Sequence, residues 1–152
     1  MAERSAGLLV FRRTEAGPVF LLAHPGGPYW TRKDFGAWTI PKGLVDADEE
    51  TFAAALREFE EETGQGVDGD FLELTPLRQK SRKLIFCWMV EAEPDLGAFR
   101  SNTFEIEWPL RSGRVQAFPE IDRVGWFTPD EALRKIHPGQ AGFIREAVQR
   151  LT

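Results

Sequence analysis

The sequence predicts an α+β fold formed by a single domain over residues 1–152. Short apolar runs rich in β-branched and aromatic residues are bounded by turn residues, which is typical of strands. Other segments combine helical periodicity with helix-capping residues. No internal repeat or low-complexity linker divides the chain. With 42% hydrophobic residues, a chain of this length can bury one substantial core.

The expected strands coincide with the apolar runs. We predict strands over residues 5–13, 18–24, 38–40, 71–79, 84–93, 103–108 and 124–127. Thr14-Glu15-Ala16-Gly17 separates the first two and is interpreted as a hairpin turn. Pro25-Gly26-Gly27-Pro28 ends the second strand and opens an irregular loop that continues to about Gly36.

Three helices are predicted between and after the strands. The first covers residues 50–63, with Asp48 as its candidate cap and Gly64 as its candidate end. Its apolar stripe, which we expect to pack on the sheet, consists of Phe52, Ala55, Leu56 and Phe59. Thr128-Pro129-Asp130-Glu131 opens the second helix with a capping threonine, an early proline and an acidic first turn. The third helix covers residues 140–151.

Three glutamates share one side of the first predicted helix. Glu58, Glu61 and Glu62 occupy positions i, i+3 and i+4, so they fall within an arc of roughly 100°. Like charges placed in this way repel, and at least one pKa rises unless a cation lies between them. Hard oxygen ligands around a partly hydrated cation suit magnesium or manganese. A solvated acidic helix face is the alternative interpretation.

The residues around these glutamates resemble the signature of the Nudix hydrolases. The matching positions are Gly43, Glu49, Arg57, Glu58, Phe59, Glu61, Glu62 and Gly64. Gln65 departs from the signature, which has an aliphatic residue there, and we expect Val67 to supply that packing. The resemblance covers roughly residues 5–136 and places the signature, or box, at 43–65. It implies the Nudix fold, a mixed β-sheet sandwiched between α-helices.

The same resemblance implies a metal-dependent hydrolase whose site lies at the box. Glu58 and Glu62 are the expected metal ligands, and Glu61 is a ligand or part of the water-activating system. A backbone carbonyl of Lys42 or Gly43 is expected to complete the coordination. The expected cofactor is Mg²⁺, with Mn²⁺ as a substitute.

Further roles follow for residues beside the glutamates. Arg57 belongs to the expected catalytic set, and we predict that it pairs with Glu49 and holds the loop against the helix. Many members of the superfamily take another carboxylate from a later loop. Glu120 is the candidate for that ligand, and Glu105 and Glu107 compete with it.

A narrower resemblance concerns the substrate. Residues 38–43 and 83–88 are similar to segments around the site of dinucleoside polyphosphate hydrolases of this superfamily. We therefore expect hydrolysis of a pyrophosphate linkage in a nucleoside diphosphate derivative, with a dinucleoside polyphosphate as the leading substrate. The alternatives are an oxidised nucleoside triphosphate, ADP-ribose, an RNA 5′-end, or a non-catalytic nucleotide-sensing domain. Loops at about 25–37 and 97–120 are expected to decide among them.

Cations and aromatic residues are expected to bind such a substrate. The predicted hairpin tip at residues 78–83 carries four cations within six residues. The candidate phosphate contacts are Lys42, Lys83 and Arg78, and the candidate base-stacking residues are Trp30, Tyr29 and Trp88. Solvated turn charges and packed core aromatics are the alternative interpretations of these residues.

Composition excludes several other classes of protein. A net charge of −5 and a pI near 5.2 argue against general nucleic-acid or anionic-membrane binding. No segment approaches the roughly 20 apolar residues of a membrane span, and the N-terminus lacks a signal-peptide pattern. The lone Cys87 lies in an apolar run, so we expect a core residue rather than a nucleophile.

The expected setting is therefore a reducing cytoplasm, where a protein without disulfides is usual. We expect a monomer or homodimer whose partner is a small-molecule nucleotide substrate. His24 and His137 have no matching partners in the sequence, so a histidine-based mechanism is not predicted.

Overall fold

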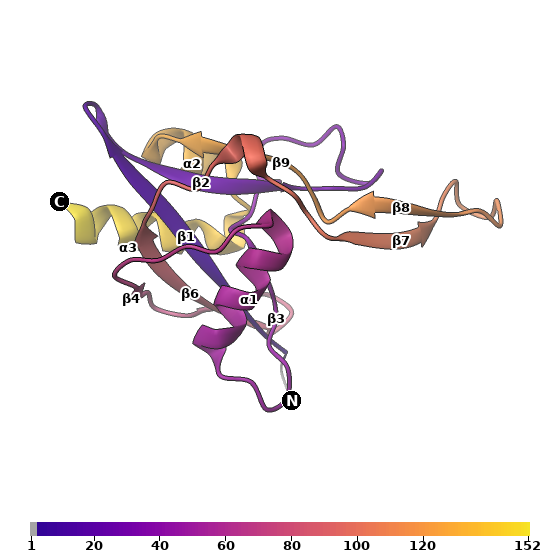
Figure 1. Cartoon of the computed structure of the whole chain (residues 1–152), viewed down its shortest axis with the longest axis horizontal. Helices are drawn as coiled ribbons and strands as arrows, with labels where there is room; N and C mark the ends of the chain where they lie inside the picture. The colour runs from indigo at the N-terminus through magenta and orange to yellow at the C-terminus, as the bar shows by residue number, and fades with distance from the viewer. Residues whose placement is uncertain (1–2) are drawn as a thin grey trace.

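The structure places a mixed sheet between helices (Figure 1). The computed structural model describes residues 3–152. The strands are β1 (Arg4–Thr14), β2 (Gly17–Pro25), β3 (Lys42–Leu44), β4 (Leu72–Glu73), β5 (Leu77–Arg78), β6 (Leu84–Glu91), β7 (Thr103–Glu107), β8 (Val115–Pro119) and β9 (Ile121–Phe127). The helices are α1 (Thr51–Thr63), α2 (Pro129–Lys135) and α3 (Ala141–Leu151), with 3₁₀ turns η1 (Leu96–Ala98) and η2 (Pro138–Gln140).

Strand β1 is the centre of the main sheet. The strand order is β4-β6-β1-β2-β9, with β3 paired to β1 and β5 paired to β6. β1 runs antiparallel to β2 and β3 but parallel to β6. The predicted mixed sheet between helices is therefore confirmed.

Alternate side chains of β1 enter two different cores, because successive residues of a strand point to opposite faces. The cluster on the α1 face contains Ala6, Leu8 and Val10 of β1 together with Ala54, Ala55 and Phe59 of α1. The cluster on the other face contains Leu9 and Phe11 of β1 together with Phe143, Ile144 and Ala147 of α3. Helix α1, which carries the three glutamates, is thus fixed by its apolar stripe against the same strand that supports α3.

Several local predictions are confirmed. The first two strands form the expected antiparallel hairpin, with Thr14 opposite Gly17. Helix α1 ends at Gly64, which adopts the left-handed conformation at φ 77° that glycine permits. Helix α2 begins with a capping box in which Thr128 and Glu131 each bond the other's backbone amide.

Three boundary predictions are wrong. The residue before α1 is Glu50, not Asp48, and no side chain caps the helix. Residues 38–40 form only isolated bridges, because the continuous pairing to β1 begins at Lys42. The strand expected over 71–79 is split into the two-residue strands β4 and β5; Pro76, which lacks a backbone donor, stands between them.

Strands β7 and β8 form a separate two-stranded ribbon that projects from the sheet (Figure 1). The prediction for 103–108 matches β7, but β8 was not expected. Val115 in β8 is 66% exposed, and most of its neighbours in the strand are also exposed. Since a ribbon strand of this kind buries little, it lacks the apolar run by which strands are identified.

Cys87 is a core residue, as predicted. It is fully buried in β6, and burial raises the pKa of its thiol well above the ordinary value. Within residues 3–152, no helix is long and apolar enough to cross a membrane.

Candidate active site

The guanidinium of Arg57 holds the loop before α1 against the helix. It donates from Nε and Nη2 to the two carboxylate oxygens of Glu49, both at 2.8 Å, and from Nη2 to the Leu44 carbonyl at 3.0 Å. These bonds lower the pKa of Glu49 to about 2 and raise that of Arg57. The predicted pairing of Glu49 with Arg57 is therefore confirmed.

Gly43 provides the space in which the Glu58 carboxylate lies. A Cβ atom at Gly43 would stand 2.0 Å from Glu58 Cδ and 2.0 Å from Glu58 Oε2. Glu58 is also fixed from its other side, where Arg57 Nη1 donates to Oε1 at 3.0 Å. Burial is the main cause that raises the pKa of Glu58, and the bond from Arg57 opposes it.

Glu62 is the most strongly perturbed carboxylate at the site. Its Oε2 accepts a hydrogen bond from the Lys42 backbone amide at 3.1 Å. Burial raises the pKa of Glu62 to about 8, and the charges of Glu58 and Glu120 add to this rise. The charged form of Glu62 is therefore disfavoured mainly by loss of water and further by the neighbouring carboxylates, and the bond from Lys42 does not offset this.

Glu120 joins the box carboxylates from the turn between β8 and β9. Its charge raises the pKa of both Glu58 and Glu62. The backbone is held here by the Glu120 amide donating to the Asn102 carbonyl at 2.9 Å. Glu105 is exposed on β7, and Glu107 accepts bonds from amides at the ribbon tip. Among these three competitors, the structure brings Glu120 to the box.

Glu61 lies differently from the other two helix glutamates. Its side chain is 44% exposed, and it accepts a bond from Arg57 Nη1 at 3.2 Å. Its charge raises the pKa of Glu58. Within residues 3–152, no three histidine, cysteine or acidic side chains are arranged so that they alone could hold a metal ion. The roles of the glutamates as ligands thus stay predictions.

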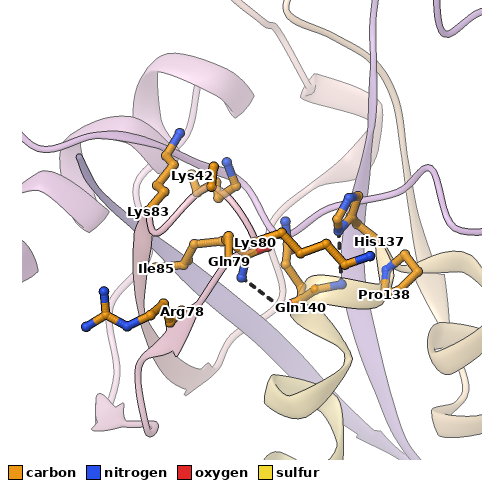
Figure 2. A pocket seen from close by; sticks show the side chains of 11 residues that line it. Lys42, Arg78, Gln79, Lys80, Lys83, Ile85, His137, Pro138 and Gln140 are labelled. Carbon is orange, nitrogen blue, oxygen red and sulfur yellow. Dashed lines mark hydrogen bonds between the residues drawn. The ribbon is translucent and has the colours of Figure 1, made fainter. Parts of the chain in front are cut away.

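Two cavities meet beside these carboxylates. The smaller, of about 240 Å³, is lined by Trp30, Glu62 and Glu120 among others. The larger, of about 600 Å³, is lined by cations, namely Lys42, Arg78, Lys80 and Lys83, and by no acidic residue (Figure 2). Lys42, His137 and Gln140 line both. The two cavities therefore adjoin at these shared residues and are together called the cleft, with Glu62 and Glu120 in the smaller part and most of the cations in the larger.

Lys42 stands where the two parts meet. It pairs with Gly7 of β1, and a Cβ atom added at Gly7 would stand 2.6 Å from Lys42 Cβ. Burial lowers the pKa of Lys42, and the nearby charge of Lys83 lowers it further. Figure 2 shows the Arg78 side chain pointing away from Lys42 and Lys83. Lys42 and Lys83 are therefore better placed than Arg78 to meet one anion.

The three aromatic candidates lie in different environments. Trp30 lines the smaller cavity, as Glu120 does. Tyr29 is 52% exposed and packs edge-on against Trp108 of the ribbon, at 5.4 Å between ring centroids. Trp88 is buried in the α1 cluster against Phe52. Trp88 is thus a core residue, and only Trp30 lines the cavity that holds the carboxylates.

Some residues of the cleft could not be found by sequence reasoning. Gln140 is buried, and its Oε1 accepts from the Ile40 amide at 3.0 Å. His137 caps η2 by accepting from the Gly139 amide. The sequence indicated no partner for His24, and the structure places Asp122 of β9 2.8 Å from its ring. The pairing joins residues that are distant in sequence, so no local spacing indicated it.

The departure at Gln65 also has a structural explanation. Its side-chain amide donates to the Asp95 carbonyl at 2.6 Å and accepts from the Asp95 amide at 2.9 Å. Val67 packs against the α1 cluster. This confirms the expectation that Val67 supplies the packing for which the signature has an aliphatic residue at position 65. Gln65 thus ties the end of α1 to the segment before η1.

Comparison with known proteins gives consistent matches. The family model described as NUDIX domain matches residues 1–147. Nudix hydrolase 10 of Arabidopsis thaliana is 42% identical over 73 residues, which are 48% of this chain and 26% of that protein. The asymmetrical bis(5′-nucleosyl)-tetraphosphatase of Rattus norvegicus is 33% identical over 105 residues, with 61% of this chain and 67% of that protein covered. This chain therefore spans about a quarter of the first relative and two thirds of the second.

A solved structure shares the fold over nearly the whole chain. The Ap4A hydrolase of C. elegans, crystallised as a binary complex, superposes with a TM-score of 0.68. It is 23% identical, and 97% of each chain is covered. At this identity the likeness concerns the fold, which confirms the predicted sheet between helices.

The raised pKa of Glu62 predicts how the stability of the metal-free protein depends on pH. A carboxyl whose folded pKa is about 8, against an ordinary 4.5, contributes full stability below 4.5 and loses it as pH rises through 8. The loss is on the order of 5 kcal/mol. Glu62→Gln removes this titrating group and the loss with it. The free energy of unfolding of the variant should therefore rise relative to that of the wild type as pH rises from 4.5 to 9.

Urea unfolding in EDTA across this range measures the difference. Glu60→Gln, an exposed change on the same helix, is the matched control and should follow the wild type. Parallel curves for wild type and Glu62→Gln would contradict the prediction.

Proposed function

The chain belongs to the NUDIX family, and from this premise we propose that it hydrolyses a pyrophosphate linkage in a nucleoside diphosphate derivative. The observation that carries the proposal is the convergence of Glu58, Glu62 and Glu120, since the charge of Glu120 raises the pKa of both helix glutamates. Glu62 and Glu120 line the smaller cavity, which shares Lys42 with the adjoining cation-lined cavity. Cleavage of a pyrophosphate needs both kinds of charge, one set for a metal and its water and one for the phosphates.

The carboxylates fit a magnesium ion by their chemistry. Glu62 and Glu120 line the same cavity, where burial and the neighbouring carboxylates disfavour the ionised form of Glu62, and a bound cation would stabilise that form. Mg²⁺ is usually held by one or two carboxylates together with substrate phosphates and water, so three converging protein ligands are not required. We propose Glu62, Glu120 and Glu58 as the carboxylates that hold Mg²⁺ or Mn²⁺. Bound there, the ion would supply a water of lowered pKa and neutralise phosphate charge.

The remaining residues have supporting roles in this proposal. Glu61 and Glu62 are the candidates to accept the proton of the attacking water, whose oxygen bonds to phosphorus as the bridging oxygen departs. Arg57 contributes to catalysis by positioning, since it donates hydrogen bonds to both Glu58 and Glu61. A carbonyl of Lys42 or Gly43 remains the proposed backbone ligand.

A dinucleoside polyphosphate is the substrate class we propose. Its phosphate chain is longer than the metal site can neutralise, and Lys42 and Lys83 line the adjoining 600 Å³ cavity. Trp30 lies in the carboxylate part of the cleft, where it can stack on one base. The rat tetraphosphatase that is similar to this chain acts on a compound of this class by its name.

A panel of nucleotides incubated with Mg²⁺, with the products identified, tests the function. The panel should include a diadenosine tetraphosphate, oxidised nucleoside triphosphates, ADP-ribose and a 5′-triphosphorylated RNA. The alternative of a nucleotide-sensing domain is disfavoured because Glu58, Glu61 and Glu62 are all present. Binding without turnover for every compound would favour it.

Glu58→Gln and Glu62→Gln should each keep the fold and lose most turnover. Removal of a positioned acid or base typically lowers rate by about 10²–10⁴-fold, and glutamine is nearly isosteric. Steady-state kinetics with thermal melting measures both properties. Glu60→Gln controls for the loss of one helix carboxylate. Near-normal activity in both variants, with normal melting, would remove the proposed metal site.

Magnesium should raise the Tm of the wild type, and the rise should disappear in Glu62→Gln. A ligand that binds only the folded state adds stability, by about 2.7 kcal/mol at 100 times its Kd. Melting series with millimolar Mg²⁺ or Mn²⁺ against EDTA measure the effect, with Glu60→Gln again as the control. An unchanged wild-type Tm at every metal concentration would argue against a site that exists before substrate binds.

Diadenosine tetraphosphate should be cleaved asymmetrically, into two different nucleotides rather than two identical halves. Lys83→Ala should reduce kcat/KM for this substrate more than for ATP, because the shorter compound does not reach as far into the cation-lined cavity. Arg145→Ala, an exposed change on α3, controls for the loss of one positive charge. Equal losses on both substrates would remove the substrate proposal and leave the family assignment intact.

A further inference from the structure

His24 is a buried residue that the proposed hydrolysis does not use. Its side chain is fully buried near the end of β2. Nε2 lies 2.6 Å from the Lys33 carbonyl oxygen, and Nδ1 lies 2.8 Å from Asp122 Oδ1. A carbonyl oxygen only accepts, so Nε2 carries a hydrogen and donates it to Lys33. The second bond, to Asp122, fixes the orientation of the ring.

The bond to Lys33 connects His24 to the proposed base-stacking residue. The Lys33 amide donates to the Trp30 carbonyl at 2.9 Å and so closes a turn over residues 30–33, here called the Trp30 turn. The Lys33 ammonium also lies over the Trp30 ring, 4.9 Å from its centroid. Two successive hydrogen bonds therefore link His24 to the backbone of Trp30.

The bond to Asp122 connects the same ring to the strand that follows Glu120. Asp122 lies on β9, two residues after Glu120. The Trp38 ring packs edge-on against the His24 ring, with 5.1 Å between the ring centroids. His24 thus bridges the Trp30 turn and the strand adjoining Glu120.

The other contacts of the loop lie mainly outside the Trp30 turn, apart from a backbone hydrogen bond in which the Trp30 amide donates to the Gly27 carbonyl at 3.2 Å. The Gly26 amide donates to the Glu120 carbonyl at 2.8 Å, before the turn. Asp34, after the turn, accepts from the Trp38 indole at 2.8 Å and pairs with Lys135. Between these anchors, the only side-chain hydrogen bond to the backbone of the Trp30 turn within residues 3–152 comes from His24.

We propose that His24, oriented by Asp122, is a positioning residue that sets the place of Trp30 relative to Glu120. It thereby aligns a stacked nucleobase with the linkage to be cleaved. The inference rests on the proposed function, and in particular on Trp30 as the base-stacking residue. A misplacement of about 1 Å can cost on the order of 10²-fold in rate, so one lost anchor is enough to matter.

A double-mutant cycle tests whether His24 acts through Trp30. His24→Asn and Trp30→Ala should each lower kcat/KM for diadenosine tetraphosphate by roughly 10–100-fold. The double variant should be no worse than Trp30→Ala, because the anchor has nothing left to position. Losses that multiply would overturn the proposal, since a merely structural defect acts independently of Trp30.

Further variants separate positioning from general destabilisation. Asp122→Asn keeps a hydrogen-bonding partner for Nδ1 and should behave like wild type, whereas Asp122→Ala should behave like His24→Asn. If His24→Asn does not fold, Asp122→Ala takes its place in the cycle. Cys87→Ala, another buried change on the sheet, is the control, and its effect should multiply with that of Trp30→Ala.

A binding measurement distinguishes failure of this inference from failure of the proposed function. Calorimetry measures AMP binding without turnover. The same double-mutant cycle can then be calculated from the Kd values for AMP. If the wild type hydrolyses nothing but binds AMP, the proposed function fails and the cycle in Kd decides the role of His24. Absence of AMP binding, or independent effects of the two changes on Kd, would overturn the inference.

Discussion

The bidentate pair between Arg57 and Glu49 is the contact on which the geometry of the site depends. Packing of the apolar stripe of α1 against β1 fixes the direction of the glutamate face, but it does not fix the loop before the helix. Arg57 does so, since one planar guanidinium bonds Glu49, the Leu44 carbonyl and Glu58 together. The loop held in this way places Gly43 under the Glu58 carboxylate, at a distance that any side chain would prevent.

Burial changes the acidic and basic groups of the cleft in opposite directions. The pKa of Glu62 rises to about 8 and that of Lys42 falls, and desolvation is the largest cause of both shifts. Lys42 nonetheless lies close enough to Glu62 for each charge to stabilise the other. A cation beside the carboxylates and an anion beside the lysines would each reduce the cost of burying these charges. This electrostatic pattern is consistent with a metal ion and phosphates that bind together.

The wall of the smaller cavity is built from segments that approach one another very closely. A Cβ atom at Gly26 would lie 1.9 Å from the Pro119 carbonyl oxygen, so only glycine allows this contact with the end of β8. Gly27, at φ 96°, would bring a Cβ atom to 2.8 Å from the Phe104 ring. The ribbon thus supports the loop that carries Trp30, although the ribbon itself projects from the sheet (Figure 1).

Local sequence specifies the first hairpin, the span of α1 and its end at Gly64, and the shared face of the box glutamates. These features depend on neighbours within a few residues, where side-chain periodicity and capping act. The Glu49–Arg57 pair was also predictable, through the resemblance of the box to the Nudix signature. Packing of the folded chain, by contrast, brings Glu120 to Glu58 and Glu62. It also buries Trp88 in the core while Trp30 lines the cavity, and it pairs His24 with Asp122. Each of these depends on contacts between segments far apart in the chain, whose relative positions are set by packing and close backbone approach rather than by local pattern.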